Sequence, residues 1–125
     1  MNGMESEREE AMRSDFREQA ALQQRTYQAG VTESEIGECF SKAREIHGRW
    51  NEGPHAGQWQ YLTGAYEDFR DRPDTMDRFL DNVEHNRAQG WDGGLDEVQR
   101  RSLRQAKALT EPHRVRPRNQ IQREH

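Results

Sequence analysis

The chain has 125 residues, of which 30% are hydrophobic and 34% are charged, and its formal net charge is −4. Globular domains usually have an apolar share of about 45–50%, so only a small core can be buried here. With Cys39 as its single cysteine and no apolar run near the roughly 18 residues of a bilayer span, the sequence excludes an intramolecular disulfide and a membrane-spanning helix. The first ten residues also lack the basic and apolar regions of a signal peptide, so we predict a soluble cytoplasmic protein with at most one domain.

The charge is distributed unevenly along the chain. Residues 1–99 carry 11 basic and 21 acidic side chains, a net charge of −10, whereas residues 100–125 carry eight basic and two acidic ones, a net charge of +6. An asymmetry of this kind points to a surface that meets a charged partner.

All strong periodic signals in the sequence are helical. Apolar residues recur at helical spacing from about Met4 to Ala29, and Gly30 is a typical residue to end such a helix. Because the opening ESEREE is entirely polar, residues 1–10 are predicted to fray. The sequence leaves open whether this first helix packs on the others or pairs with another copy.

A second helix starts at a clear signal. Thr32 and Glu35 have the spacing of a capping box, in which each side chain accepts the backbone N–H of the other residue. The apolar residues that follow are spaced as in an amphipathic helix: Ile36, Phe40, Ala43, Ile46 and Trp50.

Two further helices are separated by a proline. The first is predicted over about Pro54 to Arg72, with Pro54 in its first turn and Gly64 allowing a neighbouring backbone to approach closely. Pro73 ends that helix and Asp74 is predicted to cap the next. Their apolar faces carry Trp59, Leu62, Tyr66 and Phe69, and then Met76, Phe79, Leu80 and Val83.

A last helix is predicted from about Leu95 to Thr110, after Gly90 has ended the preceding one. The fold class is therefore all-α, a small five-helix bundle with a frayed N-terminus and a disordered basic C-terminal tail. Its boundaries are predicted at residues 1–10 for the frayed segment, 11–111 for the bundle and 112–125 for the tail. The second, third and fourth helices hold most of the large apolar residues and are predicted to form the nucleus.

The sequence contains few signs of chemistry. No zinc-ligand spacing, phosphate loop or nucleophile motif occurs, so we expect no metal, no cofactor and no enzyme activity. The turn from Trp50 to Trp59, with His55 between the two indoles, is the one place where a small enzyme site is conceivable. Its simpler interpretation is structural, since the two indoles end two helices. Cys39 is interpreted as a buried, inert thiol.

An acidic ridge on the third and fourth helices is the first candidate binding surface. Carboxylates recur there at helical spacing, and arginines interleaved with them neutralise part of the charge. The ridge consists of Asp68, Asp71, Asp74, Asp77, Asp81 and Glu84. We predict that it binds a protein partner.

The basic end of the chain is the second candidate. Arg100, Arg104 and Lys107 form a helical stripe, which Arg114, Arg116 and Arg118 extend into the tail. Such a stripe can neutralise phosphates, although aromatic residues for base stacking are missing. The same charges could instead fold back onto the acidic ridge or meet a second copy, which leaves a homodimer open.

These observations favour a non-catalytic cytosolic interaction protein that binds a protein partner through the acidic helical surface and inhibits or regulates it. The alternative is a nucleic-acid-binding accessory protein that uses the basic C-terminal helix and tail, and the third hypothesis is a small enzyme at the Trp50–Trp59 turn. The small size, polarity and arginine-rich composition resemble those of accessory proteins of phages and plasmids, a resemblance of composition and of no motif.

Overall fold

The computed structural model describes residues 5–91 and 94–113, and this part of the chain forms five α-helices and no strand. It confirms the predicted all-α class. The first helix begins within the segment that was predicted to fray, and nearly all of the predicted tail, residues 114–125, lies outside the described residues. The elements are α1 (Ser6–Arg25), α2 (Glu33–Asn51), α3 (Ala56–Asp71), α4 (Pro73–Ala88), α5 (Glu97–Thr110) and the single 3-10 turn η1 (Glu111–His113).

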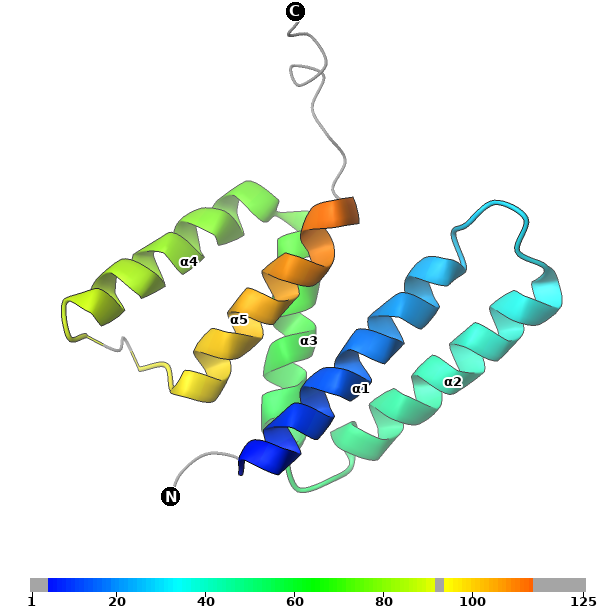
Figure 1. Ribbon diagram of the computed structural model, residues 1–125, viewed down its shortest axis with the longest axis horizontal. Helices are drawn as coiled ribbons and strands as arrows, with labels where there is room; N and C mark the ends of the chain where they lie inside the picture. The colour runs from blue at the N-terminus through cyan, green and yellow to red at the C-terminus, as the bar shows by residue number, and fades with distance from the viewer. Residues whose placement is uncertain (1–4, 92–93, 114–125) are drawn as a thin grey trace, which may run out of the picture.

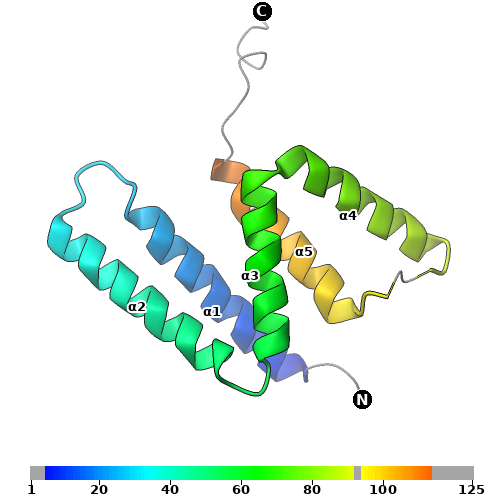
Figure 2. The same cartoon turned by 180° about the vertical axis from the view of Figure 1, so that it is seen from behind.

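The helices are arranged around α3 and α5, which pack along each other in the middle of the molecule (Figure 1). α1 and α2 form an antiparallel hairpin on one side of this pair. α4 lies on the other side and diverges from α3, starting at the junction of Arg72 and Pro73 (Figure 2). The C-terminal end of α5 lies beside this junction in both views, so the chain leaves η1 close to the apex of the α3–α4 pair.

The core differs from the predicted nucleus of the second, third and fourth helices. Its largest fully buried apolar side chains come from α1, α3 and α5: Trp59, Phe16, Phe69, Met12, Leu62 and Leu103. The helix α1, whose place the sequence left open, therefore joins the core. Phe16 contacts the rings of Trp59 and Tyr66 edge to face, with centroid distances of 5.3 and 5.5 Å. Two aromatic residues of the predicted stripes are not covered, since Phe40 is 47% exposed and Phe79 is 42% exposed.

An ion-pair network fastens α1 to α5. The carboxylate of Glu9 accepts hydrogen bonds from Arg101, at 2.7 and 2.8 Å, and from Arg13, at 2.7 and 2.9 Å. Arg13 also donates to the carbonyl of Val98 and to the hydroxyl of Ser102. Glu9 is buried by these contacts, so a residue from the polar opening of the chain is an anchor of the fold.

Two capping boxes begin helices, and only one was expected. Thr32 and Glu35 exchange hydrogen bonds of 2.9 and 3.1 Å at the start of α2, which confirms that prediction. Asp96 and Gln99 make the same arrangement at the start of α5. This helix begins at Glu97, two residues after the predicted start at Leu95. Each pair satisfies backbone donors that the first helical turn otherwise leaves without a partner.

Other predicted helix ends were wrong by a few residues. α4 begins at Pro73 itself with Arg72 in the N-cap position, so Asp74 lies inside the first turn and caps nothing. α3 begins at Ala56, after Pro54. α1 ends at Arg25, which places Gly30 in the following loop with a φ of +86°.

Gly90 ends α4 as predicted. Its φ is +91°, and its N–H donates to the carbonyl of Arg87 while the N–H of Trp91 donates to that of Asn86. This pair of bonds is the Schellman motif, which satisfies the last carbonyls of a helix and requires the left-handed conformation that glycine adopts readily.

Candidate functional site

The acidic ridge and the basic stripe lie against each other across the α4–α5 contact. Arg104 donates two hydrogen bonds to Glu84, at 2.7 and 2.9 Å, and Arg100 approaches the same carboxylate at 3.4 Å. The hydrogen bonds from Arg104 hold the pKa of Glu84 below its usual value. Farther along, Lys107 Nζ lies 3.6 Å from a carboxylate oxygen of Asp77. The fold-back that the sequence left open is therefore present within this chain.

The remaining ridge residues differ in their surroundings. Asp68 pairs with Arg72 at 2.9 Å and Asp71 pairs with Arg70 at 3.0 Å, and these are exposed pairs of low energy. Hydrogen bonding to Arg70 lowers the pKa of Asp71. Asp74 and Asp81 are exposed on α4. The six residues predicted to bind a partner thus lie on two helices, and Asp77 and Glu84 among them are used to hold α5.

The basic stripe is also partly used by the fold. The side chain of Arg100 is only 7% exposed and pairs with Glu97 as well as Glu84, so it is not available to a phosphate. Arg104 and Lys107 are more exposed, at 52% and 31%, but they face carboxylates of α4. The continuation of the stripe, Arg114, Arg116 and Arg118, lies outside the described residues. Nucleic-acid binding stays a prediction.

The Trp50–Trp59 turn is packed. The two indole rings stack with centroids 5.9 Å apart, and both are buried. The indole N–H of Trp50 donates to Asp15 at 2.7 Å, and that of Trp59 donates to Nδ1 of His47 at 2.9 Å. These contacts give both indoles a structural role, because they join the end of α2 to α1 and the start of α3 to α2. His55, the residue of the enzyme hypothesis, lies against the Trp50 ring at a centroid distance of 6.5 Å.

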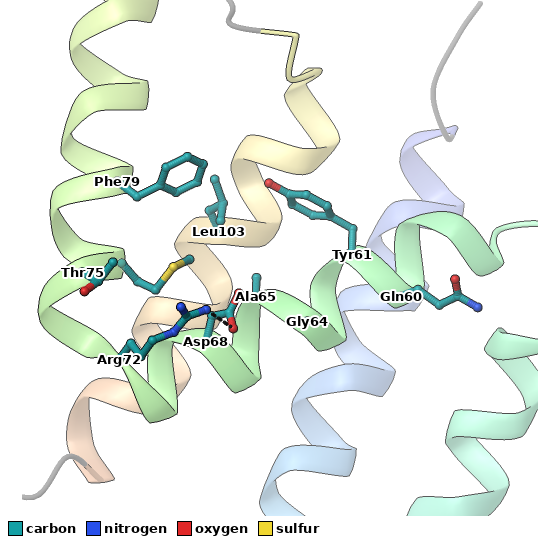
Figure 3. Close-up of a pocket in the computed structure, with 10 residues that line it drawn as sticks. Gln60, Tyr61, Gly64, Ala65, Asp68, Arg72, Thr75, Phe79 and Leu103 are labelled. Atoms are coloured by element: carbon teal, nitrogen blue, oxygen red, sulfur yellow. Dashed lines mark hydrogen bonds and ion pairs between the residues drawn. The ribbon is translucent and has the colours of Figure 1, made fainter.

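An apolar groove between α3 and α4 is the feature that the sequence did not reveal (Figure 3). It has a volume of about 460 Å³, and Leu103 of α5 forms part of its floor. Tyr61 from α3 and Phe79 from α4 form its walls, and their rings are directed toward Leu103. The other lining residues are Gln60, Gly64, Ala65, Asp68, Arg72, Thr75 and Met76.

Gly64 helps to open this groove. The sequence predicted that the glycine lets a neighbouring backbone approach, but no atom lies within 4 Å of the position where a Cβ would stand. The space above Gly64 is therefore open. Phe79 is exposed because α4 diverges from α3. Helical periodicity identifies Phe79 as part of the apolar face of α4, but it does not show whether another helix packs on that face.

The charged residues that line the groove are Asp68 and Arg72, which pair with each other. Asp68 lines the groove, and Asp71 lies three residues farther on the same face of the helix. Burial, together with the nearby charge of Asp96, raises the pKa of Tyr61 above its usual value. The groove thus combines aromatic walls, one of them the half-exposed Phe79, with the Asp68–Arg72 ion pair at its rim.

A second hollow of about 200 Å³ lies in the α1–α2 hairpin and contains Cys39. The thiol is buried, as predicted. Across residues 5–91 and 94–113, no three His, Cys, Asp or Glu side chains are placed to hold a metal ion. Within the same ranges, none of the helices has both the length and the apolar character of a membrane span.

Comparison with protein-family models, with curated proteins and with solved structures found no match for this chain.

Proposed function

We propose that this protein is a non-catalytic interaction protein that binds a protein partner through the face formed by α3 and α4, and that it inhibits or regulates that partner. The observation that carries the proposal is the apolar groove of about 460 Å³ with the half-exposed Phe79 in its wall. Exposed apolar concavities rimmed by polar residues are typical of binding surfaces on small proteins.

The charge of this face favours a basic partner. Residues 56–88 carry seven acidic and four basic side chains, and two of the acidic ones, Asp77 and Glu84, pair with α5. Of the predicted ridge, Asp68 lines the groove, Asp71 lies three residues farther along α3, and Asp74 and Asp81 are exposed on α4. Complementary charge accelerates association and orients the partner, while an apolar side chain in the groove supplies most of the affinity. We therefore expect a segment in which an apolar residue is flanked by Lys or Arg.

The test is capture of a partner from an extract of the source organism, compared between two matched pairs of variants. Gly64→Leu fills the groove, whereas Gly37→Leu adds the same side chain to open space on α2. Phe79→Lys places a charge in the groove wall, whereas Phe40→Lys does so at an exposed aromatic residue of α2.

We expect the two α2 variants to capture the same protein as the unaltered chain, and the two groove variants to bind it at least about tenfold more weakly. Circular dichroism verifies that every variant keeps its helices. Equal capture by all four variants would remove the groove from the binding surface, and recovery of nucleic acid in place of protein would favour the basic end of the chain.

A further inference from the structure

The groove requires an occupant with particular chemistry. Its walls, formed by Tyr61, Met76 and Phe79, suit one branched or aromatic side chain, and the carboxylates of Asp68 and Asp71 suit neighbouring arginines. A segment that places a single apolar residue among arginines would satisfy both requirements.

The chain itself contains such a segment. Residues 114–125 read RVRPRNQIQREH, with four arginines, one glutamate and two aliphatic residues, Val115 and Ile121, each of which has polar neighbours on both sides. We propose that residues 114–125 dock in the α3–α4 groove of the same molecule, with Ile121 as the anchor, and thereby compete with the partner for this site. The competition rests on the proposed function, whereas the docking itself does not.

The tether has the right length for Ile121. The chain leaves η1 beside the α3–α4 junction, and the pairing of Lys107 with Asp77 fixes this end of α5 against α4. Leu103, in the floor of the groove, precedes His113 by ten residues, which is about 15 Å along a helix. Eight extended residues beyond His113 span up to about 26 Å, so Ile121 can reach that depth. Two residues span about 7 Å, which is too short for Val115.

The charges also match. The arginines of this segment meet carboxylates whose present partners, Arg70 and Arg72, are exposed and bind them weakly, so an incoming guanidinium can take their place. Because the segment is covalently attached, its effective concentration at the groove is on the order of millimolar. A weak intrinsic affinity is therefore sufficient for the groove to be occupied most of the time.

Paramagnetic relaxation in the full-length chain tests the docking without any partner. A nitroxide attached at Gln122→Cys, in a Cys39→Ser background, should broaden the methyl resonances of Met76 and Leu103 and leave those of Ile36 on α2 sharp. Uniform broadening, or no broadening at all, would overturn the proposal.

Two matched pairs of variants make the assignment specific. Ile121→Asp should abolish the broadening. Val115→Asp changes the net charge by the same amount and should leave the broadening unaffected. Gly64→Leu should abolish it and Gly37→Leu should not. If both aspartate variants behave alike, the segment is attracted by charge alone and Ile121 is not its anchor, which contradicts the proposal.

Mixing isotope-labelled chains without nitroxide and unlabelled chains with nitroxide separates one molecule from two. Docking within one molecule predicts sharp Met76 and Leu103 signals in this mixture, and broadened signals would show that the segment binds a second copy instead.

The competition is tested with the captured partner. If the segment occupies the groove nine-tenths of the time, Ile121→Asp should raise the partner's affinity about tenfold over the unaltered chain. An unchanged affinity would refute the competition. A loss of docking in the nitroxide experiment, with Gly64→Leu still blocking capture, would refute this inference and leave the proposed function intact.

Discussion

Replacing Glu9 by glutamine tests whether the opening of the chain is part of the fold. Three of the four hydrogen bonds to the Glu9 carboxylate reach Oε2 and one, from Arg101, reaches Oε1. A glutamine side chain can keep its oxygen in the place of Oε2, but its NH₂ group then takes the place of Oε1 and faces a guanidinium donor of Arg101. Glu9→Gln therefore removes the negative charge and places the amide NH₂ group against a guanidinium N–H of Arg101, so that two donors face each other.

The cost is set by what the two arginines can do without this charge. A hydrogen bond to a charged group contributes about 1.5–3 kcal/mol, and truncating one partner of a buried ion pair costs about 3–5 kcal/mol. The side chain of Arg101 is 44% exposed and can be rehydrated, and Arg13 keeps its bonds to Val98 and Ser102. We therefore expect the lower end of these values, a loss of about 2 kcal/mol, which corresponds to a fall in Tm of roughly 8 °C for a domain of this size.

Urea denaturation at pH 7, followed by circular dichroism and tryptophan fluorescence, measures this loss as a lower midpoint at an unchanged slope. The matched control is Glu10→Gln, since Glu10 is the exposed neighbour. If Glu9→Gln and Glu10→Gln unfold at the same urea concentration, the segment frays as its composition suggested, and the network does not hold α1 on α5.

The pH dependence of the stability difference between the unaltered chain and Glu9→Gln provides a second check. Hydrogen bonds from Arg101 and Arg13 hold the pKa of Glu9 below its usual value, although burial opposes them. A carboxyl group whose pKa is lower in the folded state stabilises the protein fully above its unfolded pKa of about 4.3, and this contribution is lost as the pH falls through the folded pKa. The stability gap between the unaltered chain and Glu9→Gln should therefore narrow below about pH 4.

Three further predictions concern single residues. Gly90→Ala should cost about 1 kcal/mol in thermal unfolding, because φ is +91° there and no neighbour obstructs a methyl group; an unchanged Tm would mean that the Schellman turn relaxes. Asp96→Ala should cost about 1 kcal/mol through loss of its capping bond, whereas Asp74→Asn should stay within about 0.5 kcal/mol, and equal costs would contradict the observed N-caps. The pKa of Tyr61 should lie above 10 in a carbon-13 titration, because burial and Asp96 disfavour the phenolate. The stability due to Tyr61 is then complete below about pH 10 and declines as the pH rises through the folded pKa.

Signals contained within a few neighbouring residues could be predicted from the sequence. Thr32 and Glu35 specify a helix start because both hydrogen bonds of the capping box close within one turn. Gly90 specifies a helix end because the left-handed conformation is a property of that one residue. Asp74 was misassigned because the fixed φ of Pro73 is compatible with the first helical position, which moves the cap back to Arg72.

Features that join distant residues could not be predicted in this way. Glu9 and Arg101 are 92 positions apart, and nothing local shows that they meet. Periodicity places Phe79 on the apolar face of α4, but the angle between α3 and α4 decides whether that face is covered. The groove arises from this angle, so its walls were recognised as apolar residues and not as a site.

The same long-range pairing changes the interpretation of the charge asymmetry between residues 1–99 and residues 100–125. Arg100, Arg101, Arg104 and Lys107 all face carboxylates of α1, α4 or α5, so this half of the basic charge of residues 100–125 is already paired within the fold, and the other half belongs to the four arginines after His113. This has a measurable consequence for the nucleic-acid alternative. Four phosphate contacts give a slope of log affinity against log salt of about −3.6 on duplex DNA, whereas the six-residue stripe that the sequence indicated would give about −5.4. A slope near −5.4 would mean that the basic residues of α5 leave the carboxylates of α4 when nucleic acid binds. The ion pairs between α4 and α5 would then be a switch rather than a fixed part of the bundle.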